Sequence, residues 1–259
     1  MTTALQLAQL ARKLTGKFVF RKTLPREFGK ARISVTSRSD IRLLTPGFHR
    51  SASDLMQVVS LYIKPGYCVW DIGANLGIFS FCASWKAGAN GKVCSLEADS
   101  FYVELQHKTA RSLPIGYAPV IPLCGAVSDR MGILELAIPR KGHSRSHLTI
   151  VEGNQADEAE AQKQVVSITA NFLLQHWPKP DFVKVDVEGA EVLFLQGAKL
   201  LLETVRPLLY IEVNDSNQEL ATDVFSSLNY RMFALSSNGT EVRIDRCKFN
   251  TLAKPAERC

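Results

Sequence analysis

The sequence predicts an α/β protein built on a doubly wound, mostly parallel sheet. Strand and helix patterns alternate from Tyr67 onward, as expected when crossover helices connect parallel strands. The first of these strands breaks into a glycine turn and then a helix over residues 69–80, and an acidic residue, Glu97, closes the next strand. In open α/β sheets this arrangement forms a nucleotide-type pocket at the carboxyl ends of the strands. The same observations therefore predict both the fold class and the edge of the sheet that carries the ligand site.

Length and composition suit one such domain with an extension. The chain has 259 residues, of which 46% are hydrophobic, enough for a sizeable core. Its six cysteines occur singly, without a C-x-x-C pair, which favours reduced core thiols over a disulfide or zinc framework. No apolar run approaches the roughly 20 residues of a transmembrane helix, and the amino terminus does not resemble a signal peptide. We therefore expect a cytoplasmic protein with no transmembrane segment.

The net charge of +6 is concentrated near the amino terminus. Residues 1–50 contain eleven Lys or Arg and two acidic residues, a local charge of +9, whereas the remainder carries 20 basic and 23 acidic residues, or −3. We therefore divide the chain into a basic extension, 1–64, and a catalytic domain, 65–259. Such a patch attracts anionic partners, but a solvated basic face explains it equally well. Because no basic run is interleaved with aromatic residues, a nucleic-acid partner is not expected.

The extension is predicted to contain a helix, a hairpin and a second helix. Apolar residues recur at helical spacing over 7–14, which favours docking on the core, with weak peripheral membrane contact as the alternative. Alternating segments at 32–36 and 40–43 predict a small antiparallel hairpin. A Ser-Asp pair at 53–54 predicts the cap of a helix that continues to Tyr62.

The glycine loop follows a short buried strand at 67–70 and precedes a helix that continues to about Lys86. Its spacing is D-x-G-x-x-x-G, with Asn75 where a dinucleotide fingerprint would have a second glycine. Gly73 and Gly77 would let a ligand approach the backbone and leave the first helical N–H groups available to it. Asp71 is placed to orient the loop or to accept hydrogen bonds. Tight packing at a strand-to-helix turn is the alternative reading.

Glu97 ends the second strand, 92–96, about 20 residues beyond the loop. In nucleotide-binding α/β folds this position holds the ribose hydroxyls. A helix at 101–111 and a strand at 120–123 follow, and the small residues of 124–129 are expected beside the cofactor base. A β segment at 132–138 leads into a polar excursion, 139–164, which we expect over the mouth of the active site because long irregular loops in compact domains are usually functional.

The second informative stretch is 181–191, after a strand at 165–168 and a helix at 171–176. Lys184 and Asp186 share one face of the predicted strand, and Glu188 continues that face if the strand persists. Burying a cation with carboxylates is costly without pairing, so the cluster indicates a site. Glu191 falls in the first turn of a helix predicted over 190–203, where a solvated acidic helix start is the alternative reading.

The remaining elements complete the sheet. A buried strand is predicted at 206–213, a helix at 218–228, and two closing strands near 230–235 and 241–244; residues 250–259 carry no readable pattern.

Together these segments resemble the FkbM family of S-adenosylmethionine-dependent methyltransferases. The resemblance covers roughly residues 65–215, and its most specific elements are the D-I-G-A-N-x-G loop and the K-x-D-x-E-G-A-E block, a little over 100 residues apart. Two positions depart from the family pattern: no proline follows Glu97, and Asn171 stands where aspartate is frequent.

The resemblance implies a seven-stranded, Rossmann-like class I methyltransferase fold. It also implies S-adenosylmethionine as cofactor and O-methylation of a hydroxyl on a sugar, glycan or polyketide-like small molecule. The residues implied in cofactor binding are Gly73, Ala74, Asn75 and Gly77 on the methionine side, Glu97 at the ribose, Ala126 and Val127 at adenine, with Asp71 and Asp186 at the same strand ends.

Methyl transfer to oxygen needs an aligned and deprotonated acceptor. The catalytic candidates are Asp186 or Glu188 as the base, Lys184 tuning their charge, Glu191 beside them and His147 as a rival base in the polar excursion. No metal ligand is assigned, although oxygen ligands from Asp186, Glu212 and Asp215 would suit Mg²⁺.

Two other classes of function compete with this interpretation. A nicotinamide-dependent oxidoreductase could use a similar loop, but it would be expected to have the missing middle glycine. A catalytically silent methyltransferase-like binding module would keep the loop and lose the carboxylates of 184–191, which are present here. The sequence does not identify the acceptor or the oligomeric state.

Overall fold

The computed structural model describes residues 18–36, 52–139, 147–148 and 159–259. The predicted helix at 7–14 and the predicted strand at 40–43 lie outside these residues. For residues 138, 139, 147, 148 and 159–161 the structure describes the backbone alone. None of the helices in the described ranges is both long enough and apolar enough to cross a membrane.

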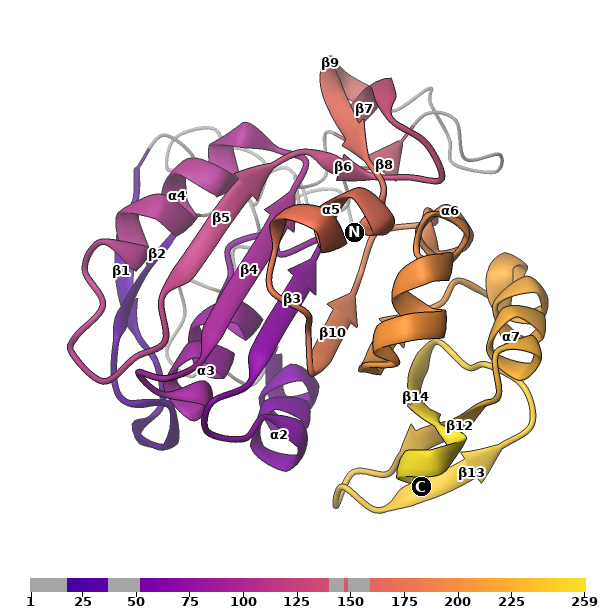
Figure 1. The fold of residues 1–259 in the computed structure, drawn as a ribbon. Helices are drawn as coiled ribbons and strands as arrows, with labels where there is room; N and C mark the ends of the chain where they lie inside the picture. The colour runs from indigo at the N-terminus through magenta and orange to yellow at the C-terminus, as the bar shows by residue number, and fades with distance from the viewer. Residues whose placement is uncertain (1–17, 37–51, 140–146, 149–158) are drawn as a thin grey trace, which may run out of the picture.

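An eight-stranded sheet forms the centre of the molecule (Figure 1), in the order β13-β12-β14-β11-β10-β3-β4-β5. Its strands are β3 (Cys68–Ile72), β4 (Lys92–Glu97), β5 (Val120–Cys124), β10 (Phe182–Val185), β11 (Leu208–Glu212), β12 (Tyr230–Leu235), β13 (Glu241–Ile244) and β14 (Asn250–Pro255). Five neighbouring strands, from β11 to β5, run parallel. The predicted fold class is therefore confirmed.

Strand β14 was not predicted, because residues 250–259 show no readable pattern. It inserts between β11 and β12 and runs antiparallel to both. Its apolar core is only Leu252 and Ala253, and it ends at Pro255, so the local sequence carries little strand signal. Long-range pairing with buried neighbours makes this segment a strand. With the edge strand β13, the sheet has eight strands instead of the seven that the resemblance implies.

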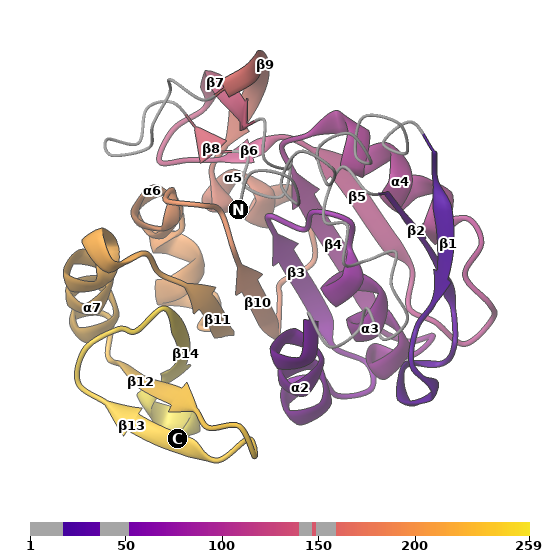
Figure 2. The same ribbon diagram turned by 180° about the vertical axis from the view of Figure 1, so that it is seen from behind.

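Helices cover both faces of the sheet, as Figures 1 and 2 show from opposite sides. On one face a core forms from α2 (Ser53–Tyr62), α3 (Ile78–Ala87) and α4 (Ser100–Ala110); the other face is covered by α5 (Ala170–His176), α6 (Glu191–Gly197) and α7 (Gln218–Ser227). Alternate residues of each strand point to alternate cores: Val69 belongs to the first and Trp70 to the second.

The described part of the amino-terminal extension packs into the first of these cores. Strands β1 (Phe20–Thr23) and β2 (Arg32–Val35) pair antiparallel around a 3₁₀ turn, η1 (Arg26–Phe28), so the strand predicted at 32–36 is present and pairs with β1, whereas the partner predicted for it at 40–43 lies outside the described residues. Helix α2 has the predicted bounds, but its N-cap is Ala52, without a side-chain hydrogen bond. The predicted cap is wrong because the Ser53 hydroxyl donates to the Asp54 carboxylate instead.

A small second sheet lies beyond the carboxyl ends of the central strands (Figure 1), in the order β6-β9-β7-β8. Its strands are β6 (Ala126–Val127), β7 (Gly132–Pro139), β8 (His147–Leu148) and β9 (Ala159–Ile168). The predicted irregular excursion therefore ends early, because β9 pairs with β7 along almost its whole length. Lys163 of β9 forms an ion pair with Asp99, its Nζ 3.0 Å from Oδ1, which ties this sheet to the start of α4.

The helix predicted over 190–203 is interrupted. Helix α6 ends at Gly197, and a π-helical turn, η6 (Leu201–Val205), follows. Gly197 packs directly on the backbone of residue 128: a Cβ atom there would lie 2.2 Å from the Ser128 carbonyl oxygen. The close approach of the Ser128 segment accounts for the glycine at the end of α6.

Candidate functional site

The loop between β3 and α3 is held tightly by its neighbours. The backbone N–H groups of Gly73 and Ala74 both donate to the Leu96 carbonyl of β4, at 2.9 and 3.0 Å, and the Gly77 N–H donates to the Ala74 carbonyl at 2.8 Å. The Gly73 and Ala74 N–H groups hold the loop against β4 and that of Gly77 closes a turn within the loop, so the shape of the loop is set before any ligand arrives.

Asn75 explains how the loop manages without a second glycine. Its φ is +51°, in the left-handed region, which asparagine adopts more readily than most residues. Its backbone N–H donates to Glu97 Oε2 at 2.7 Å, and its side-chain Oδ1 accepts from the Leu76 N–H at 2.7 Å. The loop and the acidic residue of the next strand, which the sequence predicted to act together, are therefore in direct contact.

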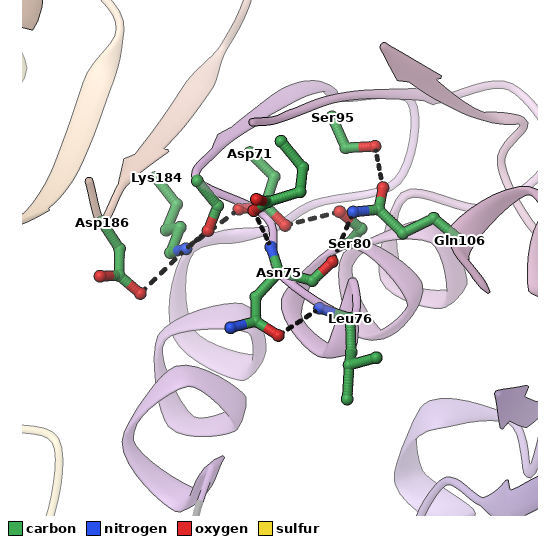
Figure 3. A network of polar contacts seen from close by, with 10 residues as sticks. Asp71, Asn75, Leu76, Ser80, Ser95, Gln106, Lys184 and Asp186 are labelled. Carbon is green, nitrogen blue, oxygen red and sulfur yellow. Dashed lines mark hydrogen bonds and ion pairs between the residues drawn. The ribbon is translucent and has the colours of Figure 1, made fainter. Parts of the chain in front are cut away.

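Lys184 lies at the centre of a buried charge network (Figure 3). Its Nζ donates to the Gly73 carbonyl at 2.8 Å and lies 3.3 Å from both Asp71 Oδ1 and Asp186 Oδ2. Parallel pairing of β10 with β3 sets Lys184 directly opposite Asp71. The side chain of Lys184 is 3% exposed and that of Asp71 is fully buried, so this cation and carboxylate neutralise each other inside the sheet.

The surroundings of Lys184 favour its charged form. Burial alone would lower the pKa of Lys184, but the carboxylates of Asp71, Asp186 and Glu212 outweigh burial and raise it well above its usual value. The remaining oxygen of Asp71, Oδ2, accepts from the Ser80 hydroxyl at 2.5 Å. Asp71 is thus placed to orient the loop, which is one of the two roles predicted for it. Its side chain is buried inside the sheet.

The protein's own backbone leaves space only for a glycine at position 73. Its φ is +73°, and a Cβ atom there would lie 1.8 Å from the Asp186 carbonyl oxygen. The sequence attributed this glycine to the approach of a ligand. The structure shows that the segment after β10 comes close to the loop at this position and leaves no room for a side chain.

Glu97 ends β4 as predicted, and it is only partly exposed. Its Oε1 accepts the Asp99 N–H at 2.8 Å and its Oε2 accepts the Asn75 N–H at 2.7 Å. Burial raises the pKa of Glu97 to about 7, although both backbone N–H groups act to lower it. Each carboxylate oxygen has a second lone pair, so Glu97 can accept further hydrogen bonds from hydroxyl groups.

Asp186 and Glu212 form the more open part of the carboxylate cluster. The pairing of Val185 with Ile211 brings the ends of β10 and β11 together, so Asp186 and Glu212 are neighbours. The Asp186 side chain is 27% exposed, and Glu212 is partly buried. Burial and then the charge of Asp186 raise the pKa of Glu212 to about 7, which brings its ionisation close to neutral pH.

Glu188 does not continue the strand face that carries Lys184, and Glu191 lies at the start of the following helix. Strand β10 ends at Val185, and Glu188 lies in a turn with φ +45°. The buried Glu191 carboxylate accepts the Gly189 N–H at 2.7 Å through Oε1 and the Asn217 amide at 2.7 Å through Oε2. In this arrangement Glu191 holds the turn that precedes α6.

The remaining predicted site residues lie on the small second sheet. Ala126 and Val127 form β6 and are buried; the Gly125 N–H donates to the Glu97 carbonyl at 2.9 Å, which brings this strand to the end of β4. The backbone of His147 lies in β8, and its side chain is outside the described part of the structure.

The described residues contain no group of three or more His, Cys, Asp or Glu side chains that could hold a metal ion. Asp186, Glu212 and Asp215 are therefore not gathered into such a group in the described part of the structure. Asp215 lies in the 3₁₀ turn η7 (Asp215–Asn217), where its carboxylate accepts from the Gln218 side chain at 2.8 Å.

Comparison with known proteins decides the family. The model of the methyltransferase FkbM domain matches residues 71–238, which include the glycine loop, Glu97 and the carboxylate cluster. The chain belongs to the FkbM methyltransferase family. S-adenosylmethionine is the methyl donor that this family implies.

Individual relatives of this FkbM-family chain are distant. It is 26% identical over 162 residues to the hexuronic acid methyltransferase AglP of Haloferax volcanii, a match that covers 60% of each protein. The structure of methyltransferase FkbM from Methylobacillus flagellatus superimposes with a TM-score of 0.50 at 14% identity, over 77% of this chain and 47% of that one. Fibrillarin from Aeropyrum pernix, solved with bound S-adenosylmethionine, matches at a TM-score of 0.44 and 12% identity, over 79% of this chain and 73% of that one. The chain thus spans about half to three fifths of the length of the first two relatives.

These matches do not favour a nicotinamide-dependent oxidoreductase. The sequence did not reveal several residues of the candidate site: Ser80, Gln106 and Asn217 each bond to a loop or carboxylate named above, and Ser95 bonds to Gln106. A weak signal existed for Gln106, because it shares a helical face with Tyr102 and Thr109, which are also buried. Ser80, Ser95 and Asn217 carried no such signal, because their partners are brought to them only when the chain folds.

Proposed function

We propose that this chain transfers the methyl group of S-adenosylmethionine to a hydroxyl oxygen of a sugar or glycan, or of a related polyhydroxylated small molecule. The observation that carries the proposal is the FkbM domain match across the very residues that form the loop, Glu97 and the carboxylate cluster. A sugar acceptor is supported by the similarity to a hexuronic acid methyltransferase.

The residues at the ends of β3 and β4 fit a nucleoside-containing cofactor. Glu97 keeps free acceptor capacity for the ribose hydroxyls, and the loop from Gly73 to Gly77 is already fixed beside it. On this proposal Ala74 and Asn75 line the methionine side, while Ala126 and Val127 flank adenine. When bound, the cofactor supplies an electrophilic methyl group on its sulfonium.

We assign proton acceptance to Glu212, with Asp186 orienting the acceptor hydroxyl. The two carboxylates lie at adjacent strand ends, and the raised pKa of Glu212, about 7, suits a general base that works near neutral pH. Asp186 forms an ion pair with the buried Lys184, whose Nζ lies 3.3 Å from Asp186 Oδ2. The alternative base is Glu188, and retention of full activity after Glu188→Gln would remove it.

A first prediction concerns the pH dependence of cofactor affinity. Protonation removes the charge of Glu97 and part of its capacity to accept hydrogen bonds, so affinity for S-adenosylmethionine is expected to fall as the pH drops below about 7. Isothermal titration at pH 8 and pH 6 should show about a tenfold loss, because most of the protein carries the neutral acid at the lower pH. In Glu97→Gln the affinity should be weak at both values; a wild-type affinity that does not change with pH would contradict the assignment.

Methyl transfer itself is tested with a cofactor labelled on its methyl group and a panel of hexoses, hexuronic acids and oligosaccharides. We expect label to enter one class of sugar, with heat-denatured protein as the control. Binding of S-adenosylmethionine without transfer to any acceptor would support the silent binding module instead. Titration with NAD in parallel, expected to show no heat of binding, checks the oxidoreductase alternative.

A further inference from the structure

Gln106 connects the interior of the domain to the glycine loop. It lies on α4, and its side chain is fully buried between β4 and the loop. Its amide Nε2 donates to the Asn75 carbonyl at 2.6 Å, and its Oε1 accepts from the Ser95 hydroxyl at 2.7 Å (Figure 3). This buried glutamine therefore uses both ends of its amide, one toward a strand and one toward the loop.

Gln106 bonds to Asn75, a non-glycine residue of the loop whose backbone conformation is unusual. Asn75 is in the left-handed region, and its N–H is held by Glu97. Gln106 holds the carbonyl of the same residue, so the peptide units on both sides of Asn75 are fixed from outside the loop. A left-handed non-glycine residue persists only where its surroundings specify it, and here Glu97 and Gln106 do so.

The Asn75 carbonyl and the Ser95 hydroxyl together fix the orientation of the Gln106 amide. If the amide were turned over, its oxygen would face the Asn75 carbonyl oxygen, and two acceptors would meet in a buried space. The Ser95 hydroxyl, itself buried, donates to Oε1 and favours the productive orientation. The order of contacts is thus Ser95, Gln106, Asn75 and Glu97, from the interior of β4 to the predicted ribose-binding carboxylate.

We propose that Gln106, oriented by Ser95, is a positioning residue that sets the affinity of the glycine loop for S-adenosylmethionine. The proposal rests on the proposed role of this loop in cofactor binding. Without Gln106, the Asn75 carbonyl loses its hydrogen bond from the interior, and part of the free energy of cofactor binding is spent on ordering the loop at this peptide.

The test compares Gln106→Leu and Ser95→Ala with a matched control, Thr109→Val. Thr109 lies on the same helix, is equally buried and accepts the Ser34 N–H at 2.9 Å, but it faces β2 instead of the loop. All three variants lose buried hydrogen bonds, and each should lower the melting temperature. Cofactor affinity, measured by isothermal titration at a temperature where every variant is folded, separates positioning from general stability.

We expect Gln106→Leu to weaken the Kd for S-adenosylmethionine about tenfold and Ser95→Ala to weaken it less, with the double variant no worse than Gln106→Leu because the two act in series. Thr109→Val should stay within about twofold of wild type. If both variants in the contact chain keep wild-type affinity while their melting temperatures fall like that of Thr109→Val, Gln106 has a structural role only and the proposal is overturned. Should Gln106→Leu fail to fold, Ser95→Ala decides by the same criterion. A wild-type protein that does not bind S-adenosylmethionine would overturn the cofactor role of the loop, and this proposal with it.

Discussion

Replacement of Lys184 by methionine is expected to lower the free energy of unfolding by about 3–5 kcal/mol, because it removes one partner of a buried ion pair. Methionine fills much of the same volume, so the loss reflects charge more than packing. Asp71 would be left fully buried without its cation, and the Gly73 carbonyl would lose a hydrogen-bond donor. Urea unfolding followed by circular dichroism measures the change.

Lys199→Met is the matched control. The Lys199 side chain is 74% exposed, and its Nζ lies 3.9 Å from Glu203 in a helical pair. Such surface pairs contribute about 0–1 kcal/mol, so this variant should unfold at nearly the wild-type urea concentration. Equal unfolding free energies for Lys184→Met and the wild type would show that the buried network is not what holds the loop to β10.

The second large effect is expected at Glu212. The Glu212→Gln variant keeps the shape of the side chain and removes its basicity, so kcat should fall about 10²–10⁴-fold, the usual contribution of a general base. The Kd for S-adenosylmethionine should be unchanged, since Glu212 ends β11, and β10 lies between β11 and the strand β3 that leads into the glycine loop. Rapid-quench or steady-state assays with labelled cofactor separate the two quantities.

The pH profile gives a second readout for Glu212. Its raised pKa, about 7, means that the carboxylate is protonated and unable to accept a proton at lower pH, so kcat at saturating cofactor should rise as the pH increases through about 7. That rise should disappear in Glu212→Gln. Asp215→Asn, on the neighbouring turn, is the control and should retain kcat within about twofold. A Glu212→Gln enzyme with wild-type kcat and the same pH profile would return the role of base to Asp186 or Glu188.

Local sequence patterns were sufficient to predict the part of the site built by neighbouring residues. The loop from Asp71 to Gly77, the acidic end of β4 and the helix α4 that follows it are all predicted by short-range signals. In these segments the residue type is dictated by backbone conformation or by helix termini, and both leave a trace in the sequence.

Contacts between distant segments explain what the sequence did not predict. Lys184 meets Asp71 only because β10 lies beside β3 in the sheet, and sequence order does not give strand order. Strand β14 exists for the same reason, since its neighbours β11 and β12 bury a segment with little intrinsic preference. The partners of a buried side chain are also set by the fold. Glu191 is a catalytic candidate from its place at a helix start, but only the structure reveals Asn217 and Gly189 as its partners.

The central claim is methyl transfer from S-adenosylmethionine to a sugar hydroxyl, and the position of the methyl group in the product tests it most directly. A hexuronic acid offers two kinds of oxygen: a hydroxyl, which needs a base, and a carboxylate, which is already deprotonated at neutral pH. We expect label to be carried from a ¹³C-methyl cofactor to a ring hydroxyl oxygen, as an ether that survives mild alkali and shows an NMR correlation to a ring carbon. Label on the carboxyl group, released by mild alkali as from an ester, would contradict the proposed hydroxyl acceptor and the assignment of Glu212 as its base.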